Sequence, residues 1–187
     1  MNSTEARSRL VDGNARYIAD QLEAKLQDAS RRSAVTGGQS PFAIILSCAD
    51  SRVVPELIFD TGIGEIFVIR VAGNVANTSS IASIEYAVAH LGVKLIVVLG
   101  HQSCGAVTAA IAGGDNGHNL NHLLAHLQPA VTATGKDGVD ATVRENAKQT
   151  CQELVSRSGI LSGAVADGLS IVPAWYVLET GGVEYLD

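Results

Sequence analysis

The sequence predicts an α/β fold in which a central, mostly parallel β-sheet is flanked by helices. Four apolar runs rich in β-branched residues are continuous rather than alternating, as expected of strands that are covered on both faces. Segments with helical spacing separate these runs, and such alternation is typical of parallel sheets with right-handed crossovers. The expected strands are 42–46, 65–71, 94–100 and 169–178.

The N-terminal part of the chain is predicted to be a helical arm. Residues 6–26 have a helical pattern, and a polar, glycine-containing linker follows at 30–40. We therefore expect one domain spanning 1–187, with the arm and linker at 1–36 and the α/β core at 37–187. No strand is expected beneath the arm, so it docks either on a neighbouring subunit or on its own domain.

Helices are predicted between the later strands. In "NTSSIASIEYAVAHLG" (77–92), Ser and Thr begin the helix, Gly92 ends it, and apolar residues fall at helical spacing. Further helices are expected at 105–112, 120–133 and 139–157. The tail predicts a turn at Gly181-Gly182 and then a short edge strand.

The composition excludes several classes of function. The chain has 187 residues, 47% of them hydrophobic and 17% charged, with a net charge of -6. This balance is typical of a globular protein, and the absence of a basic patch argues against a nucleic-acid partner. No apolar run has the length of a membrane span, and residues 1–10 lack the apolar stretch of a secretory signal. We expect a cytoplasmic protein.

Two cysteines and a histidine follow predicted strands. Cys48 comes after the first strand, and His101 and Cys104 come after the third. In an open parallel sheet, sites form beyond the carboxyl ends of the strands. Two thiols and an imidazole suit Zn²⁺, and three protein ligands leave a fourth position for chemistry. The third cysteine, Cys151, lies in a predicted helix without a partner motif, and we expect it to be a packing residue.

Other motifs fail on spacing. Cys48 and Arg52 are separated by three residues rather than the five of a phosphatase-like loop, and Gly62 and Gly64 lack the third glycine of a dinucleotide fingerprint. Ser103 is out of position for a nucleophile elbow. Three histidines at i, i+4 and i+8 are expected to form a solvated or interface stripe rather than a metal site: His118, His122 and His126.

Asp50 and Arg52 lie two and four residues after Cys48. A carboxylate there can take the open position on zinc, and an arginine beside it can hold the carboxylate away as a bidentate partner. The pair is therefore predicted to act as a switch. An incidental surface ion pair is the alternative interpretation.

These motifs resemble those of the β-class carbonic anhydrases. The matching segments are "CADSR" (48–52), "GHQSCGAV" (100–107), "GEIFVIRVAGN" (64–74), "SIEYAV" (83–88) and "GNARY" (13–17). The resemblance implies one zinc per chain on Cys48, His101 and Cys104, with Asp50 and Arg52 as the catalytic dyad. It also implies a homodimer or a dimer of dimers in which the N-terminal arm packs on a partner subunit.

The likeness is to the plant-like subtype of that family. In that subtype the substrate cleft forms across the dimer, and the matching positions here are Gln39, Phe67, Ala72 and Tyr86. The other subtype has a tryptophan three residues before the first zinc ligand, where it builds a non-catalytic bicarbonate pocket. Ile45 occupies that position here.

The implied activity is the reversible hydration of CO2 to bicarbonate and a proton by zinc-bound hydroxide, gated by the dyad. Two thiolate ligands cancel the charge of the ion, so we expect activity to favour alkaline pH. A carbonyl sulfide or carbon disulfide hydrolase on the same zinc site is an alternative. A non-catalytic zinc or redox-sensing protein is a third possibility.

Overall fold

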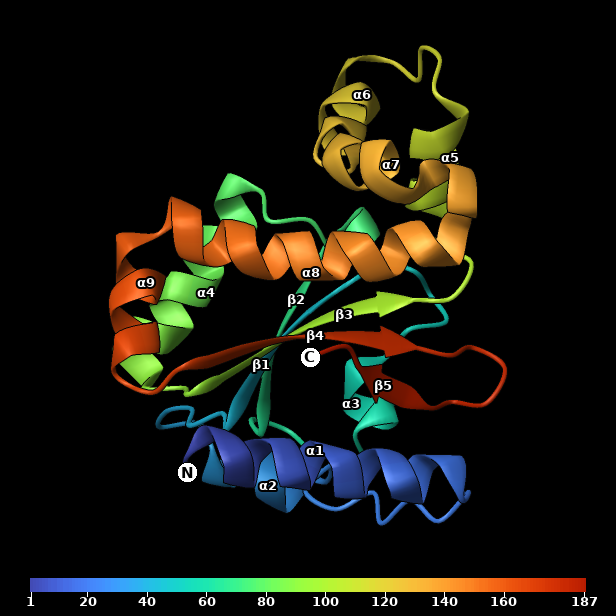
Figure 1. The fold of residues 1–187 in the computed structure, drawn as a ribbon. Helices are drawn as coiled ribbons and strands as arrows, with labels where there is room; N and C mark the ends of the chain where they lie inside the picture. The colour runs from blue at the N-terminus through green and yellow to red at the C-terminus, as the bar shows by residue number, and fades with distance from the viewer.

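The computed structural model describes residues 1–187 and contains a five-stranded sheet between two layers of helices (Figure 1). The strand order is β2-β1-β3-β4-β5. The first four strands are parallel, and β5 pairs antiparallel with the end of β4. The strands are β1 (Ala43–Ser47), β2 (Ile66–Arg70), β3 (Leu95–His101), β4 (Ser170–Tyr176) and β5 (Val183–Tyr185). The predicted fold class and the edge strand in the tail are both confirmed.

The two central strands, β1 and β3, are buried along their whole length. Their side chains alternate between two apolar clusters, one on each face of the sheet. Ile45 and Leu99 belong to one cluster, and Ile44 and Ile96 belong to the other. Because both faces are apolar, these strands appear in the sequence as unbroken hydrophobic runs.

Helices cover each face of the sheet. Helices α1 (Ser3–Ile18) and α3 (Pro55–Ile58) pack on one face, and α4 (Thr78–Leu91), α8 (Val139–Arg157) and α9 (Gly159–Ala166) pack on the other (Figure 1). Helices α5 (Gly105–Ala112), α6 (His118–Ala125) and α7 (Gln128–Thr134) form a group beside the start of α8. Short helical turns lie at Ala72–Asn74 (η1) and Gly135–Asp137 (η2), and α2 spans Ala29–Ala34.

The N-terminal helix docks on the sheet of its own chain. Ala6 and Leu10 are buried in the apolar cluster on that face. The buried amide of Asn14 donates to the carbonyl groups of Ile58 and Gly181, and its oxygen accepts from the N–H of Val183. The expectation that no strand lies beneath this helix is therefore wrong. Packing of the arm on a partner subunit stays a prediction.

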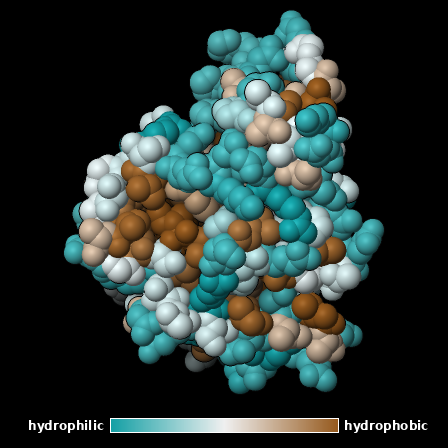
Figure 2. Space-filling view, in the orientation of Figure 1, coloured by the Kyte–Doolittle hydropathy of each residue, from teal (hydrophilic) through white to brown (hydrophobic).

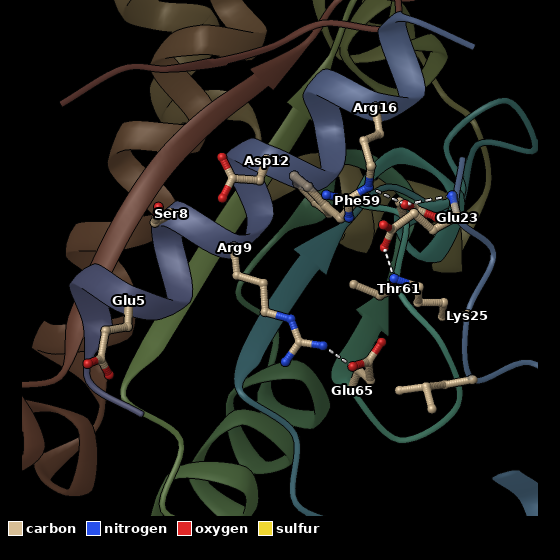
Figure 3. Close-up of a pocket in the computed structure, with 12 residues that line it drawn as sticks. Glu5, Ser8, Arg9, Asp12, Arg16, Glu23, Lys25, Phe59, Thr61 and Glu65 are labelled. Carbon is tan, nitrogen blue, oxygen red and sulfur yellow. Dashed lines mark hydrogen bonds and ion pairs between the residues drawn. The ribbon is translucent and has the colours of Figure 1, made fainter. Parts of the chain in front are cut away.

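Ion pairs along α1 add to this attachment (Figure 3). Arg9 pairs with Glu65, and the Nε of Arg16 lies 2.5 Å from Oδ2 of Asp60. Asp60 also accepts from the N–H groups of Glu23 and Ala24. These contacts tie α1 and the segment that follows it to the loop before β2.

Some predicted helix boundaries are wrong. The arm helix ends at Ile18 rather than near residue 26, and α2 overlaps the first part of the expected linker. The helix expected at 120–133 is two helices, because Pro129, in the first turn of α7, has no backbone N–H with which to continue the preceding helix. Helix α9 was not predicted; Gly159 and Gly163 dilute its pattern. Helices α5 and α8 have the expected bounds.

Candidate metal centre

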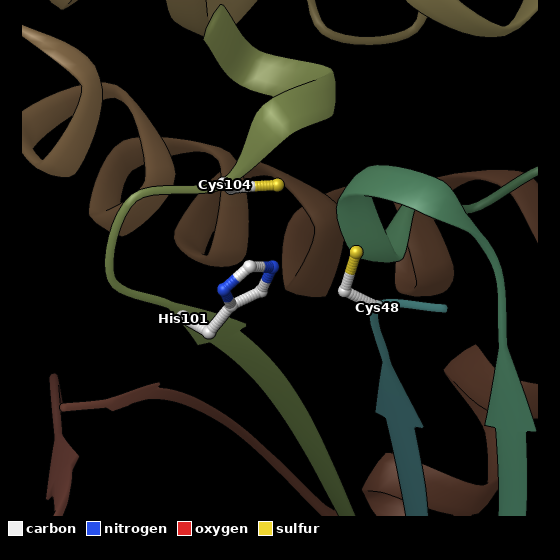
Figure 4. A group of neighbouring side chains, drawn as sticks. All are labelled: Cys48, His101 and Cys104. Carbon is white, nitrogen blue, oxygen red and sulfur yellow. The ribbon is translucent and has the colours of Figure 1, made fainter. Parts of the chain in front are cut away.

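Cys48, His101 and Cys104 meet at the carboxyl ends of β1 and β3 (Figure 4). Cys48 follows β1, His101 is the last residue of β3, and Cys104 precedes the first turn of α5. One ligand atom from each residue lies within 4.8 Å of the others, and all three residues are buried. Strands β1 and β3 are neighbours in the sheet, and their pairing brings Cys48 close to His101 and Cys104, which are far from it in the sequence.

The imidazole of His101 has a free nitrogen that faces this cluster. Its Nδ1 lies 2.9 Å from the carbonyl oxygen of Gln102. Since a carbonyl only accepts, the ring proton belongs on Nδ1 and the lone pair on Nε2. Nε2 is fully buried and has no hydrogen-bond partner. A buried, unpartnered acceptor costs free energy unless something binds it, and a metal ion satisfies it.

The two thiols lie close enough to affect each other's ionisation. The pKa of Cys48 is lowered to about 4, first by the neighbouring thiol of Cys104 and then by the nearby His101 ring and the N–H of Gly73, against the effect of burial. The same pairing and burial raise the pKa of Cys104. The N–H of Gly73 lies 3.3 Å from the Sγ of Cys48. The structure thus stabilises a thiolate at Cys48, and a divalent cation bound here would displace the remaining thiol proton.

The donor set fits zinc. Two buried thiols and one imidazole lone pair converge, which suits a borderline-soft ion. Structural zinc sites are usually closed by four protein ligands, whereas this group offers three. A fourth position is therefore open to a small molecule.

Asp50 lies beside the triad and is held by Arg52. The carboxylate receives two hydrogen bonds from the guanidinium and one from the backbone N–H of Arg52. These bonds keep the pKa of Asp50 well below its usual range. Its Oδ2 is 3.8 Å from the Nε2 of His101. The acid therefore lies next to the open side of the cluster as a carboxylate.

Arg70 supports the same loop. Its Nε lies 3.0 Å from the carbonyl oxygen of Cys48, and its Nη2 lies 2.7 Å from that of Asp50. Neither Arg70 nor Gly73 was expected from the sequence to contact the metal-binding segment. Gly73 has a φ of 71°, and a glycine in "AGN" directly after a strand is the signal that could have marked its backbone as functional.

The predicted cleft residues do not all come together in one chain. Ala72 precedes Gly73 and therefore lies near Cys48. The rings of Phe67 and Tyr86 are neighbours, with centroids 6.4 Å apart. Phe67 lies near the start of β2 and Tyr86 lies within α4, whereas the metal ligands lie at the carboxyl ends of the strands. Gln39 precedes β1 and is exposed at the opposite end of the sheet from the metal ligands.

The larger hollows of the surface lie elsewhere. The cavity in Figure 3, of about 610 Å³, is lined mainly by charged side chains that α1 and the 59–65 loop contribute. An apolar groove lies where α8, α9 and the beginning of β4 meet, and it is the broad hydrophobic area in Figure 2. Neither contains a residue of the triad. The histidines at 118, 122 and 126 form no metal-ligand group.

No helix in the structure combines the length and the apolar character that crossing a membrane requires.

The fold and the site together define an α/β metalloprotein with a three-ligand centre at the carboxyl edge of its sheet. Residues 43–183 match the family model described as carbonic anhydrase. "Carbonic anhydrase 2" of Mycobacterium tuberculosis is 40% identical over 188 residues, covering 96% of this chain and 91% of that protein. The chain belongs to the carbonic anhydrase family.

Solved structures place it in the β class. A tetrameric β-carbonic anhydrase of Sordaria macrospora has a TM-score of 0.77 and 26% identity, with 92% of this chain and 90% of that chain covered. The Coccomyxa β-carbonic anhydrase in complex with acetazolamide has a TM-score of 0.77 and 29% identity, with 95% and 84% covered.

Proposed function

We propose that this chain catalyses the reversible hydration of CO2 to bicarbonate and a proton, with zinc on Cys48, His101 and Cys104. One observation carries the proposal: a buried three-donor cluster has an unpartnered His101 Nε2, and a carboxylate beside it is turned onto an arginine. A structural zinc site is usually closed by four protein ligands, so it has no open position from which a carboxylate must be kept away. In a site with an open metal position, a neighbouring carboxylate would compete for that position unless another group bound it.

When bound, zinc lowers the pKa of a coordinated water and so supplies the nucleophile near neutral pH. The chain's own residues orient that chemistry. Asp50 can accept a hydrogen bond from the nucleophile, because Arg52 keeps it ionised and Oδ2 receives only one hydrogen bond from the guanidinium, whereas Oδ1 receives two. The N–H of Gly73 stabilises the Cys48 thiolate, so it limits the charge that this sulfur passes to the ion.

Arg52 acts as the gate in this proposal. Its side chain is 53% exposed, and it reaches Asp50 from the solvent side. With Arg52 in place, the carboxylate is a hydrogen-bond acceptor beside the open position. Without it, the carboxylate becomes a competitor for that position, because an unpaired anion next to a cation lowers its energy by binding it.

We propose that the substrate cleft is completed by a second copy of the chain and that the protein belongs to the plant-like subtype. Within one chain, Gln39, Phe67 and Tyr86 lie away from the triad, and Gln39 and Tyr86 are exposed. A partner that brings them to the neighbouring site accounts for both facts. Self-association agrees with the tetrameric state of the Sordaria macrospora relatives.

The position of Ile45 supports the subtype. Ile45 is fully buried in the core, and the Arg70 guanidinium is occupied by the carbonyl groups of Cys48 and Asp50. The OH of Tyr176 lies 3.3 Å from that of Tyr17. By the same resemblance, Arg70 and Tyr176 occupy the other two positions of the bicarbonate pocket. With Ile45 they present no free anion pocket in this chain.

Stopped-flow hydration of CO2, with zinc content measured on the same sample, tests the proposal. We expect about one zinc per chain and hydration well above the uncatalysed rate. Carbonyl sulfide and carbon disulfide are assayed in parallel. Faster turnover of either sulfur substrate than of CO2 would move the assignment to a sulfur hydrolase. Stoichiometric zinc without turnover of any of the three would indicate a non-catalytic site.

A further inference from the structure

Helix α8 lies against the metal centre without supplying a ligand. Asp140, Val143 and Asn146 are spaced three residues apart and so lie along one side of the helix. At Gly100, the residue before His101, a Cβ would lie 2.6 Å from a methyl carbon of Val143. The helix therefore approaches the backbone of the metal-binding segment as closely as a glycine permits.

Asn146 holds the residue whose backbone N–H faces the first thiol. It is 3% exposed, and its Nδ2 lies 2.9 Å from the carbonyl oxygen of Gly73. The N–H of that same residue donates to the Sγ of Cys48. Glycine can adopt many combinations of φ and ψ, and Gly73 lies in the left-handed region. By binding the carbonyl oxygen of Gly73, Asn146 restricts these angles and with them the direction of the Gly73 N–H.

Asp140 holds the turn between the other two ligands. Its Oδ1 lies 2.8 Å from the backbone nitrogen of Ser103. Ser103 has a φ of 55°, which is uncommon for a residue with a side chain. The turn from His101 to Cys104 passes through this residue. A carboxylate on its N–H stabilises the backbone conformation that brings both ligands to one point.

The same turn contacts the gate. The carbonyl oxygen of Ser103 lies 3.4 Å from the Nη2 of Arg52, whose guanidinium holds Asp50. Asp140 is thus linked through one residue, Ser103, to the arginine of the dyad. Asn146 has no such link, since its contact is on the Cys48 side.

We propose that Asp140 and Asn146 are positioning residues of the metal centre, acting from one helix on its two halves. The inference rests on the proposed zinc site. The two residues need opposite hydrogen-bonding capacities: Asp140 must accept from a backbone N–H, and Asn146 must donate to a backbone carbonyl. An exchange between carboxylate and amide is therefore tolerated at 140 and is harmful at 146.

Zinc affinity, measured by competition with a chelator, is the first readout. Loss of a partner that orients a metal ligand typically costs about 10- to 100-fold in affinity or activity. We expect a loss of this size in Asp140→Ala and near wild-type affinity in Asp140→Asn, because the asparagine oxygen still accepts. If Asp140 serves only the positive end of the helix dipole, both variants lose the same charge and behave alike. Equal loss in the two variants, or none in either, overturns the role of Asp140.

At Asn146 we expect the exchange between amide and carboxylate to weaken zinc binding, in contrast to position 140. Asn146→Asp keeps the shape but loses the donor, and Asn146→Ala loses both, so both bind zinc at least about 10-fold more weakly. Gln149→Ala is the matched control, because Gln149 bonds only Glu145 on the same helix. Wild-type zinc affinity in a folded Asn146→Ala overturns the role of Asn146. If that variant does not fold, Asn146→Asp decides by the same criterion.

The absorption spectrum of the cobalt-substituted protein is the second readout, because ligand-field bands report coordination geometry without depending on turnover. We expect altered bands in Asp140→Ala and Asn146→Ala and unchanged bands in Asp140→Asn and Gln149→Ala. Unchanged bands in the first two contradict the proposal. A wild-type protein that binds no metal refutes the proposed zinc site itself, and this outcome is distinct from failure of the two helix residues.

Discussion

Both carboxylate oxygens of Asp50 are held by the guanidinium of Arg52, with Nε 2.9 Å from Oδ1 and Nη2 2.8 Å from Oδ2. This bidentate geometry is stronger and more directional than a single contact between a lysine and a carboxylate. It orients Asp50 beside the triad while keeping the carboxylate occupied. Arg52→Ala should therefore retain zinc but lose most CO2 hydration.

The same pair makes a prediction about pH. The Arg52 guanidinium holds the pKa of Asp50 well below its usual range, so Asp50 stays ionised from pH 6 to 9. A rise in rate over about pH 7 to 9 then reports ionisation of coordinated water rather than of Asp50. Asp50→Asn should keep zinc and lose activity at every pH in this range. Stopped-flow assays with metal analysis test both variants. A wild-type rate near neutral pH in Arg52→Ala would contradict the gating role of Arg52.

The three cysteines should differ in their effect on metal content. Cys48→Ser and Cys104→Ser remove converging ligands, so zinc and activity should be lost together. Cys151 lies in α8 within the apolar core, and burial raises its pKa to about 12, so Cys151→Ser should keep both. Metal analysis by mass spectrometry decides, and full zinc occupancy in either of the first two variants contradicts the ligand assignment.

A cleft shared between subunits predicts complementation. A Cys48→Ser chain lacks a ligand but keeps the cleft residues that it lends to a partner. A Gln39→Ala/Tyr86→Ala chain has the opposite defect, and both changed side chains are exposed, so folding should be preserved. Co-expression should produce mixed oligomers with one intact site and hydration above that of either variant alone. Activity no higher than the sum of the separate variants would mean that each chain completes its own site.

Two glycine substitutions should have opposite effects on stability. A Cβ at Gly13 would run into the backbone of Phe59, so Gly13→Ala must push α1 off the sheet. We expect a loss of about 1–3 kcal/mol in the free energy of unfolding, as for overpacking. Gly163 lies within α9 with open space around its Cβ position, and Gly163→Ala should gain about 0.4–1 kcal/mol. Urea unfolding of both variants measures the difference, and a neutral Gly13→Ala would argue against close docking of α1.

Asp60 should stabilise the fold in a pH-dependent way. Burial alone would raise its pKa, but hydrogen bonds from Arg16 and two backbone N–H groups lower it overall. A depressed folded-state pKa contributes stability above the unfolded value of about 4, and this stability is lost as the pH falls through the folded value. Asp60→Asn should cost about 1–3 kcal/mol at pH 7 and progressively less below pH 4. A pH-independent difference in urea unfolding would contradict this, and the exposed Glu179→Gln is the control.

The sheet and the triad could be predicted for one physical reason. Strands buried on both faces appear as unbroken apolar runs, and the ligands follow those runs directly, so Cys48 and His101 belong to one edge of the sheet. The end of the arm helix was harder to predict, because Ala24 and Leu26, which follow it, adopt a positive φ that is uncommon for their residue types. The second layer of the site was not predicted at all. Asn146 and Asp140 act through backbone groups, and such contacts leave no pattern in a single sequence.

The origin of the ligands on β1 and β3 has a consequence for biosynthesis. These strands are neighbours in the sheet, yet β2 and α4 lie between them in the chain. A chain emerging from the ribosome can complete the centre only after β3 has been made and placed beside β1. An ion that binds afterwards ties the two central strands together and stabilises only the finished structure. We therefore expect metal to prolong the lifetime of the native protein by slowing its unfolding, while the rate of folding stays that of the metal-free chain.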